Sequence, residues 1–207
     1  MVVTTLSRKG SRAYSSAVPR VIFFPLLPPL ARPHTHAIVM TCTSDTALQK
    51  RALRRHLRSD RDALSLAHRA DCATHALQHL VTWQPWAAAT LVASYLPHES
   101  EFDPTLLAQA ARDRGADTVC PRVNGKSISF HHWQIGDGTE ETIGGVLQPL
   151  PTAPVVDAAA IDLFLTPLLG CGDSGMRLGY GGGFYDRLFA QAGGFRLGVG
   201  FALQRVS

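Results

Sequence analysis

Two stretches of this chain are the most informative about its fold: Ile161-Asp162-Leu163-Phe164-Leu165-Thr166, and the later run Arg177-Leu178-Gly179-Tyr180-Gly181-Gly182-Gly183-Phe184-Tyr185-Asp186. The first stretch is short and mostly apolar, which predicts a buried strand. The residues after the glycine-rich run predict a helix from about Phe184 to Ala192. In α/β sheets, ligands bind where a strand leads into a loop of this kind. The stretch therefore predicts a ligand site as well as an α/β fold.

The loop between this strand and this helix has the composition of a phosphate-binding loop. Glycine lets the backbone bend so that its N–H groups converge on phosphate oxygens. The glycines that allow this are Gly175, Gly179, Gly181, Gly182 and Gly183. The helix that follows adds the positive end of its dipole. Arg177 supplies a forked cation for phosphate, and Asp186, in the first helical turn, supplies an oxygen ligand for magnesium.

Two common phosphate-loop patterns do not match this loop. The Walker pattern ends in Gly-Lys-Ser/Thr, and the loop contains no lysine. The dinucleotide pattern Gly-x-Gly-x-x-Gly, counted from Gly179, requires a glycine at 184, where the chain has phenylalanine. The composition of the loop alone therefore leaves a flexible connector open as the alternative.

The segments around the loop alternate between helix and strand signals. Helices are predicted from Ser44 or Asp45 through Leu64, from Ser65 through Leu80, and from Asp103-Pro104 to Gly115; further strands are predicted at Ala88–Leu96, Thr118–Arg122, Ser127–Trp133 and Arg196–Phe201. The pair Asn124-Gly125 predicts a hairpin turn, and residues 134–157 are expected to form a loop. The alternation predicts a three-layer α/β/α fold with a mostly parallel sheet and helices on both faces.

The composition favours a single cytoplasmic domain. The chain has 207 residues, 45% of them hydrophobic, and four widely spaced cysteines that form neither a zinc motif nor a disulfide framework. No run of 18 or more apolar residues occurs, so no membrane span is expected. Residues 1–80 carry 12 Lys/Arg against 4 Asp/Glu, whereas residues 81–207 carry 8 against 12. This asymmetry suits an anionic small ligand between the two parts, a nucleic-acid surface or a solvated basic helix.

Residues 1–43 differ from the rest of the chain. They contain five basic residues, no acidic residue, and five prolines between Pro19 and Pro33. Three of these prolines interrupt the apolar run Val21–Leu30, which therefore cannot form a continuous helix. We interpret residues 1–43 as an unstructured or non-native extension, with a transit peptide or a true start at Met40 as alternatives. The orderly domain is expected to span residues 44–207.

The run Arg177–Asp186, preceded by Pro167-Leu168 and Gly175, resembles the signature of the 5-formyltetrahydrofolate cyclo-ligase family, also called methenyltetrahydrofolate synthetases. Three further blocks agree in order and spacing. Lys50-Arg51-Ala52-Leu53-Arg54 resembles the basic helix that contacts ATP in this family, and Tyr95–Asp103 resembles its folate segment. A third block, Pro121-Arg122 with Ile128–Trp133, resembles its central hairpin. The resemblance covers residues 46–204.

The resemblance implies an ATP- and magnesium-dependent cyclisation of 5-formyltetrahydrofolate to 5,10-methenyltetrahydrofolate, with release of ADP and phosphate. It implies that Arg177 and Lys50 neutralise phosphate charge as catalytic residues, that Asp186 holds magnesium, and that Leu96 and Glu101 contact the folate. The residues expected to contact ATP are Lys50, Arg51, Ala52, Leu53, Arg54, Arg177, Leu178, Gly179, Tyr180, Gly181, Gly182, Gly183, Phe184 and Tyr185. A monomer without nucleic-acid or membrane partners is expected.

Each of these side chains also has a purely structural interpretation: a solvated helix face for Lys50 and Arg54, a helix cap for Glu101, a complement to the helix dipole for Asp186, and core packing for Tyr185. The pairs His131-His132 and His34/His36 lack further ligands at useful spacing, so no metal site is expected there.

The chain departs from the family pattern in the loop and at its end. Cys171-Gly172 stands where an aromatic-Asp pair is usual, and Tyr180 and Gly182 leave no lysine in the glycine run. The family continues past Ser207 with a His-Asp pair and a final strand, so we expect a missing carboxy-terminal part and weaker magnesium-ATP binding. A catalytically impaired nucleotide- or folate-binding remnant is the main alternative function. A nucleic-acid module on the basic segment 50–69 and a sugar-phosphate isomerase are further alternatives.

Overall fold

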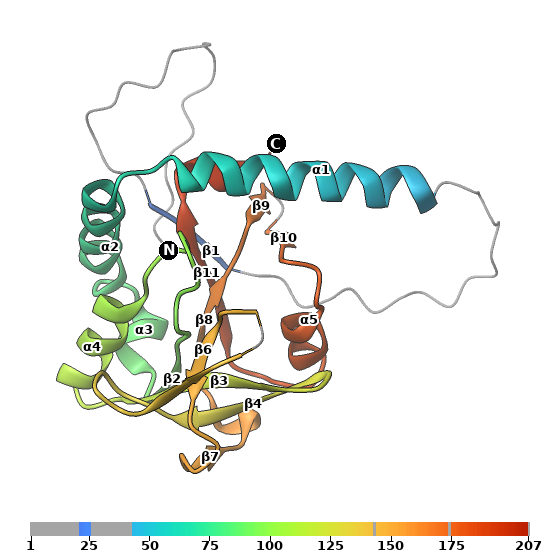
Figure 1. Ribbon diagram of the computed structural model, residues 1–207. Coiled ribbons are helices and arrows are strands. Elements are labelled where there is room, and N and C mark those ends of the chain that lie inside the picture. Colours follow the sequence, from blue (N-terminus) through green and yellow to red (C-terminus); the bar gives the residue numbers. More distant parts are fainter. Residues whose placement is uncertain (1–20, 26–42, 143, 174, 207) are drawn as a thin grey trace.

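Within the described residues 21–25, 43–142, 144–173 and 175–206, the computed structural model contains a seven-stranded mixed sheet of order β1-β11-β8-β2-β3-β4-β7 (Figure 1). The strands are β1 (Val21–Pro25), β2 (Leu91–Ala93), β3 (Asp117–Asn124), β4 (Ser127–His132), β7 (Val155–Val156), β8 (Leu163–Pro167) and β11 (Phe195–Phe201). The four central strands β11, β8, β2 and β3 are parallel, and β1, β4 and β7 are antiparallel to their neighbours. The mostly parallel sheet that the alternation predicts is confirmed.

The sheet buries apolar side chains on both faces. Along β8, Leu163 and Leu165 face one core cluster and Phe164 faces the other, because successive side chains of a strand point to opposite faces. The first cluster includes residues of α2 (Leu66–Leu80), α3 (Gln84–Ala88) and α4 (Thr105–Asp113), and the second includes Phe189 of α5 (Phe184–Phe189). Helices therefore cover both faces, as expected (Figure 1).

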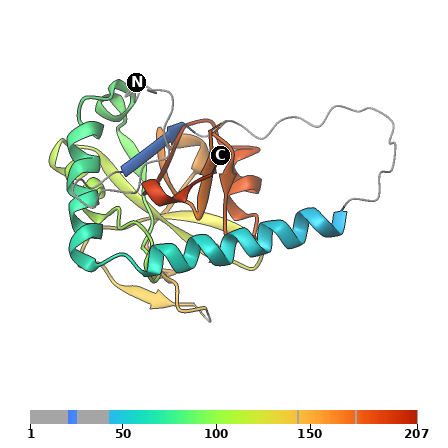
Figure 2. The ribbon, with the colours of Figure 1, turned by 90° about the horizontal axis from the view of Figure 1, so that it is seen from above.

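Helix α1 (Thr43–Asp62) lies across the end of the sheet to which β8 leads (Figure 1). Seen from above, it runs alongside the segments that follow β8 (Figure 2). The approach is close at the start of the loop, because a Cβ added to Gly170 would lie 2.8 Å from Leu57 Cδ1. The basic helix and the glycine-rich loop are thus direct neighbours.

Several elements agree with the sequence prediction. The hydroxyl of Ser65 caps α2 by accepting a hydrogen bond from His68 N at 3.2 Å. Strands β3 and β4 form the predicted hairpin, and Gly125 has φ 59°, as the turn requires. β11 also lies at the expected position, one residue longer.

Three predictions differ from the structure. The strand expected at Ala88–Leu96 is only three residues long, because α3, with a proline in its first turn, extends to Ala88. The region 134–157 is not a simple loop: it contains the hairpin of β5 (Thr139–Glu141) and β6 (Leu147–Pro149), as well as β7. Helix α5 ends at Phe189 rather than at Ala192, so its dipole is shorter than expected.

The amino-terminal segment contributes one strand. Val21–Pro25 forms β1, which pairs antiparallel with β11 at the edge of the sheet. These five residues therefore take part in the fold. In this respect the structure differs from the interpretation of residues 1–43 as an unstructured extension. Residues 1–20 and 26–42, including Met40, His34 and His36, lie outside the described residues, and the domain boundary near residue 44 stays a prediction. Over the described chain, no helix combines the length and the apolar character of a membrane span.

Asp162 joins the beginnings of two central strands. Its Oδ2 accepts hydrogen bonds from Thr90 N and Thr90 Oγ1, both at 2.8 Å, and from Leu91 N at 3.0 Å. The hydrogen bonds from Thr90 lower the pKa of the Asp162 carboxyl below its usual value. The carboxylate therefore stabilises the folded state when it is ionised.

We expect Asp162→Ala to lower the free energy of unfolding at neutral pH by about 1–2 kcal/mol, a value discounted for partial exposure of the carboxylate. Because the folded-state pKa lies below the unfolded value of about 3.9, this stabilisation is complete above that pH and is lost as the pH falls through the folded-state pKa. Denaturant titrations at neutral and acidic pH measure the difference, with Asp117→Ala, an exposed carboxylate on β3, as control. A difference that grows on acidification contradicts this role.

Candidate active site

A cleft of about 1150 Å³ lies between α1, the segment after β2, the β3–β4 hairpin, β6 and the glycine-rich loop. It lies at the carboxyl end of β8, where open α/β sheets bind ligands. The residues singled out from the sequence that line it are Lys50, Leu53, Arg54, Leu96, Glu101, Arg177, Leu178, Gly179, Tyr180, Gly181, Gly182, Gly183, Phe184, Tyr185 and Asp186. The structure thus gathers residues that are up to 136 positions apart into one cleft.

Two residues of the expected ATP-contacting set lie elsewhere. Arg51 and Ala52 are exposed on α1, outside the lining of the cleft. The period of 3.6 residues per turn explains this, since Lys50, Leu53 and Arg54 share one face of the helix and the two residues between them do not.

Helix α1 is tied to the loop by a hydrogen bond. Arg54 Nε donates to the carbonyl oxygen of Gly179 at 2.8 Å. Arg54 is half-buried, so a solvated helix face does not describe it, whereas Lys50 is exposed at the edge of the cleft. The loop itself depends on glycine at Gly181 and Gly183, which have φ 105° and 66°.

Arg177 and Asp186 form an ion pair inside the cleft. Arg177 Nη2 lies 2.9 Å from Asp186 Oδ1, and Nη1 donates to the Pro167 carbonyl at 3.3 Å. The guanidinium carbon lies 5.4 Å from the centroid of the Tyr185 ring. The Arg177 side chain is only 11% exposed, whereas that of Asp186 is 72% exposed. The arginine is therefore held in place, and the carboxylate is free to approach a ligand from solvent.

Glu101 lines the cleft from the segment that follows β2. Its Oε2 accepts a hydrogen bond from His98 N at 3.0 Å. The interpretation of Glu101 as the cap of the next helix is wrong, because Asp103 accepts the hydrogen bond from Thr105 N, at 2.9 Å. Glu99 in the same segment has φ 53°, which is unusual for a residue with a side chain and is typical of functional segments.

Burial makes the thiols of this region unreactive. The pKa of Cys171, which lines the cleft, is raised to about 11, first by burial and then by the charge of Asp173. The thiol therefore stays protonated at neutral pH and does not act as a nucleophile or a metal ligand. Of the cysteines that the structure describes, Cys120 and Cys171 are free thiols; Cys42 lies outside the described residues.

One wall of the cleft was not predicted from the sequence. Val146, Leu147 and Gln148 of the β5–β6 hairpin line it. The hairpin is held against β3 because the Glu140 carboxylate lies 2.5 Å from Arg122 Nη2 and the Gln148 side chain accepts from Val123 N at 3.0 Å. These contacts join residues that are distant in the sequence, so no local motif predicts them.

Gln204 was also not predicted from the sequence, although its side chain holds the backbone at the start of the loop in place. Its side chain is buried in the short helix η2 (Ala202–Gln204), where Nε2 donates to the Leu168 carbonyl at 2.8 Å and the Leu169 carbonyl at 3.1 Å. Its Oε1 accepts from Phe201 N at 2.8 Å. The following strand β12 (Arg205–Val206) pairs with β9 (Gly170–Gly172), which in turn pairs with β10 (Arg177–Leu178). The loop therefore contains a small sheet of its own.

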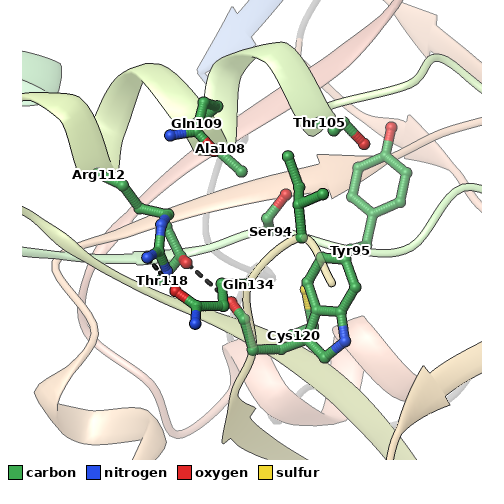
Figure 3. Close-up of a pocket in the computed structure, with 11 residues that line it drawn as sticks. Ser94, Tyr95, Thr105, Ala108, Gln109, Arg112, Thr118, Cys120 and Gln134 are labelled. Atoms are coloured by element: carbon green, nitrogen blue, oxygen red, sulfur yellow. Dashed lines mark hydrogen bonds between the residues drawn. The ribbon is translucent and has the colours of Figure 1, made fainter. Parts of the chain in front are cut away.

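A second, much smaller cavity of about 10 Å³ lies between α4 and β3 (Figure 3). Ser94, Tyr95 and Cys120 line it, and Thr118 Oγ1 donates to the Trp133 carbonyl at 2.9 Å beside it. Its volume is close to that of a single water molecule, so it does not accommodate a nucleotide or a folate.

The parallel sheet with a glycine-rich loop at the carboxyl end of β8 defines an α/β protein with a ligand cleft at that sheet edge. A profile of the 5-formyltetrahydrofolate cyclo-ligase family matches residues 46–201, so the chain belongs to this family of ligases. The resemblance seen in the sequence is confirmed. The 5-formyltetrahydrofolate cyclo-ligase of Escherichia coli (strain K12) is 25% identical over 135 residues, which cover 63% of this chain and 74% of the relative.

Two solved structures share the fold. The 5,10-methenyltetrahydrofolate synthetase of Aquifex aeolicus has a TM-score of 0.66 at 26% identity, covering 75% of this chain and 79% of that one. The 5,10-methenyltetrahydrofolate synthetase of Mycoplasma pneumoniae has a TM-score of 0.55 at 24% identity, covering 69% and 77%. The second likeness bears on the fold alone.

Proposed function

We propose that this protein catalyses the ATP- and magnesium-dependent cyclisation of 5-formyltetrahydrofolate to 5,10-methenyltetrahydrofolate, with release of ADP and phosphate. The observation that carries the proposal is the large cleft lined together by the glycine-rich loop, the cations of α1, and Glu101. Membership of the cyclo-ligase family supports the same reaction.

The proposed nucleotide subsite lies between the loop and α1. The amides of Gly179–Gly183 bind the phosphates, and Lys50, Arg54 and Arg177 neutralise their charge. The short helix α5 adds little to this binding, so the loop and the side chains supply most of it.

The cleft fits a magnesium ion that arrives with the nucleotide. Among the described residues, no group of three or more His, Cys, Asp and Glu side chains is arranged to hold a metal. Magnesium is often bound by one or two carboxylates together with substrate phosphates, and Asp186 is an exposed carboxylate beside the loop. When bound, the ion would neutralise charge on the phosphates during transfer.

The proposed folate subsite lies along the segment that follows β2. Glu101 accepts hydrogen bonds from pterin nitrogens, and Leu96 contacts the flat face of the pterin. Both side chains are half-buried in the cleft wall, which holds them in a defined position.

The reaction proceeds in three steps. The N5-formyl oxygen attacks the γ-phosphorus of ATP, and the bond from that phosphorus to the β,γ-bridging oxygen breaks to release ADP. The N10 lone pair then adds to the activated formyl carbon and N10 loses its proton. Finally the bond from carbon to the phosphate oxygen breaks, which releases phosphate and leaves the methenyl bridge. Such a reaction needs positioning and charge neutralisation more than acid–base catalysis.

The proposal is tested by following the absorbance of the methenyl product with substrate, ATP and magnesium. Sustained turnover that requires all three supports it. Binding of both ligands without product identifies the chain instead as a catalytically impaired binding protein. The assay thus separates the two functions that share this cleft.

The proposed role of Asp186 as a magnesium ligand can be tested because Asp186 also pairs with Arg177. We expect Asp186→Asn to weaken binding of magnesium-ATP by about tenfold or more, because a carboxylate ligand is lost. In the absence of metal, the variant is expected to bind ATP as tightly as the parent protein or more tightly, because Arg177 loses its partner carboxylate and can pair with phosphate. Calorimetric titrations with and without magnesium measure both.

Asp173→Asn is the matched control. Asp173 also lines the cleft and also pairs with an arginine, Arg205, at 2.6 Å. The Asp173→Asn variant is expected to bind ATP, with and without magnesium, within about twofold of the parent affinities, because surface ion pairs contribute little. If Asp173→Asn produces the magnesium-dependent loss and Asp186→Asn does not, the metal role of Asp186 is wrong.

A further inference from the structure

Arg61 is a buried cation that the proposed reaction does not use. It lies in the last turn of α1 and its residue exposure is 0%. Its Nε donates to Ser100 Oγ at 2.9 Å, and its Nη1 donates to the hydroxyl of Tyr180 at 2.5 Å. Within the part of the chain that the structure describes, Nη2 has no hydrogen-bond partner. Burying a guanidinium with an unsatisfied N–H is costly, so its presence calls for a role other than packing.

Tyr180 is the residue of the glycine-rich loop that Arg61 holds. Its ring is close to two guanidinium groups, with centroid distances of 5.7 Å to Arg58 and 5.8 Å to Arg61. The Tyr180 hydroxyl also interacts with the carboxylate of Glu101. Burial, followed by this carboxylate, raises the pKa of the Tyr180 hydroxyl, so it remains a proton donor at neutral pH. One hydroxyl therefore receives a hydrogen bond from Arg61 and faces Glu101.

The same arginine also contacts the segment that carries Glu101. Ser100 precedes Glu101 directly, accepts the hydrogen bond from Arg61 Nε, and donates to Asp62. Arg61 thus connects, from one buried position, the loop at Tyr180 and the segment at Ser100. Moving either segment changes the hydrogen bonds of the other.

We propose that Arg61 and Tyr180 are positioning residues that couple the two substrate subsites. This inference rests on the proposed function. Phosphate binding orders the loop and fixes Tyr180, which holds the Glu101 carboxylate in the orientation that accepts the pterin. The cost of ordering these groups is met by the first ligand, so the second binds more tightly. By thermodynamic linkage, the folate tightens nucleotide binding by the same factor.

The test measures the affinity for 5-formyltetrahydrofolate by calorimetry, alone and with magnesium and the β,γ-imido analogue of ATP. In the parent protein we expect the analogue to tighten folate binding by about fivefold or more. In Tyr180→Phe, which keeps the ring and loses the hydroxyl, the ratio of the two affinities is expected to fall to about one, because Arg61 and Glu101 lose their common contact. The melting temperature checks that this variant folds.

Arg61→Lys provides a second variant and is expected to lower the ratio as well, because an ammonium keeps the charge but has one nitrogen, whereas the guanidinium contacts Ser100 and Tyr180 through two. Arg55→Lys, on the exposed side of the same helix, is the control and keeps the parent ratio. If both ligands bind the parent but their affinities are independent, or if Tyr180→Phe keeps the full ratio, the coupling is refuted and the proposed function stands. If neither ligand binds the parent, both proposals fail.

Discussion

Replacing Arg177 by glutamine is expected to lower turnover of 5-formyltetrahydrofolate by about 100- to 1000-fold, the range seen when one preorganised group that stabilises transition-state charge is removed. The guanidinium is held by Asp186, by the Pro167 carbonyl and by the Tyr185 ring, and it is almost fully shielded from water. A shielded cation acts strongly on charge that develops on the transferred phosphoryl group. The glutamine removes this charge and keeps a polar side chain that can still donate hydrogen bonds.

Arg205→Gln controls for the loss of an arginine near the loop. Arg205 also pairs with an aspartate, at 2.6 Å from Asp173, but its side chain is 44% exposed and it lies outside the lining of the cleft. The turnover of the Arg205→Gln variant is expected to stay within about twofold of the parent value. Turnover rates at saturating ATP measure the effect. If Arg177→Gln and the parent protein turn over at equal rates, Arg177 has no catalytic role.

The second large effect is expected at Gly181, which has φ 105°. A Cβ at this position lies 3.8 Å from the Arg54 guanidinium carbon, an ordinary contact, so the strain comes from the backbone and not from a clash. Holding a branched residue in this conformation costs about 1–3 kcal/mol. Gly181→Val therefore drives the loop into another conformation, turns its amides away from the phosphates, and weakens magnesium-ATP binding by about 10- to 100-fold.

Gly115→Val separates loop geometry from general loss of stability. Gly115 has φ 93° and open space where its Cβ would lie, but it follows α4, outside the cleft. Its backbone strain matches that of Gly181, so a similar fall in melting temperature is expected, with unchanged nucleotide affinity. Nucleotide titration of the two variants provides the comparison. A Gly181→Val protein that binds as tightly as Gly115→Val shows that the loop backbone does not bind the phosphates.

Elements with strong local signals were predictable from the sequence. Ser65 caps α2 because a hydroxyl at that position satisfies a free N–H group, and Asn124-Gly125 turns the hairpin because glycine tolerates its positive φ. Signals of this kind depend on neighbours in the chain. The hairpin of β5 and β6 lacks them, because Arg122 and Gln148 hold it in place through contacts with distant strands.

The candidate site shows the same division. The glycine-rich run and the basic helix could be singled out because each is a contiguous pattern of residues. Their relative position could not, since the hydrogen bond from Arg54 to Gly179 joins residues 125 positions apart. The exposure of Arg51 and Ala52 and the role of Gln204 likewise depend on which face of an element meets the cleft.

The class of fold and the glycine-rich run of the candidate site could be derived from the sequence alone, because periodicity, glycine content and turn residues act over a few neighbouring positions. The family could be recognised from contiguous motifs in the same way. The packed chain was needed to show that Arg177 pairs with Asp186 and that Arg61 contacts both Tyr180 and Ser100. These pairings arise when the sheet brings α1 and the loop to the same edge. Distance and burial there depend on the packed chain as a whole.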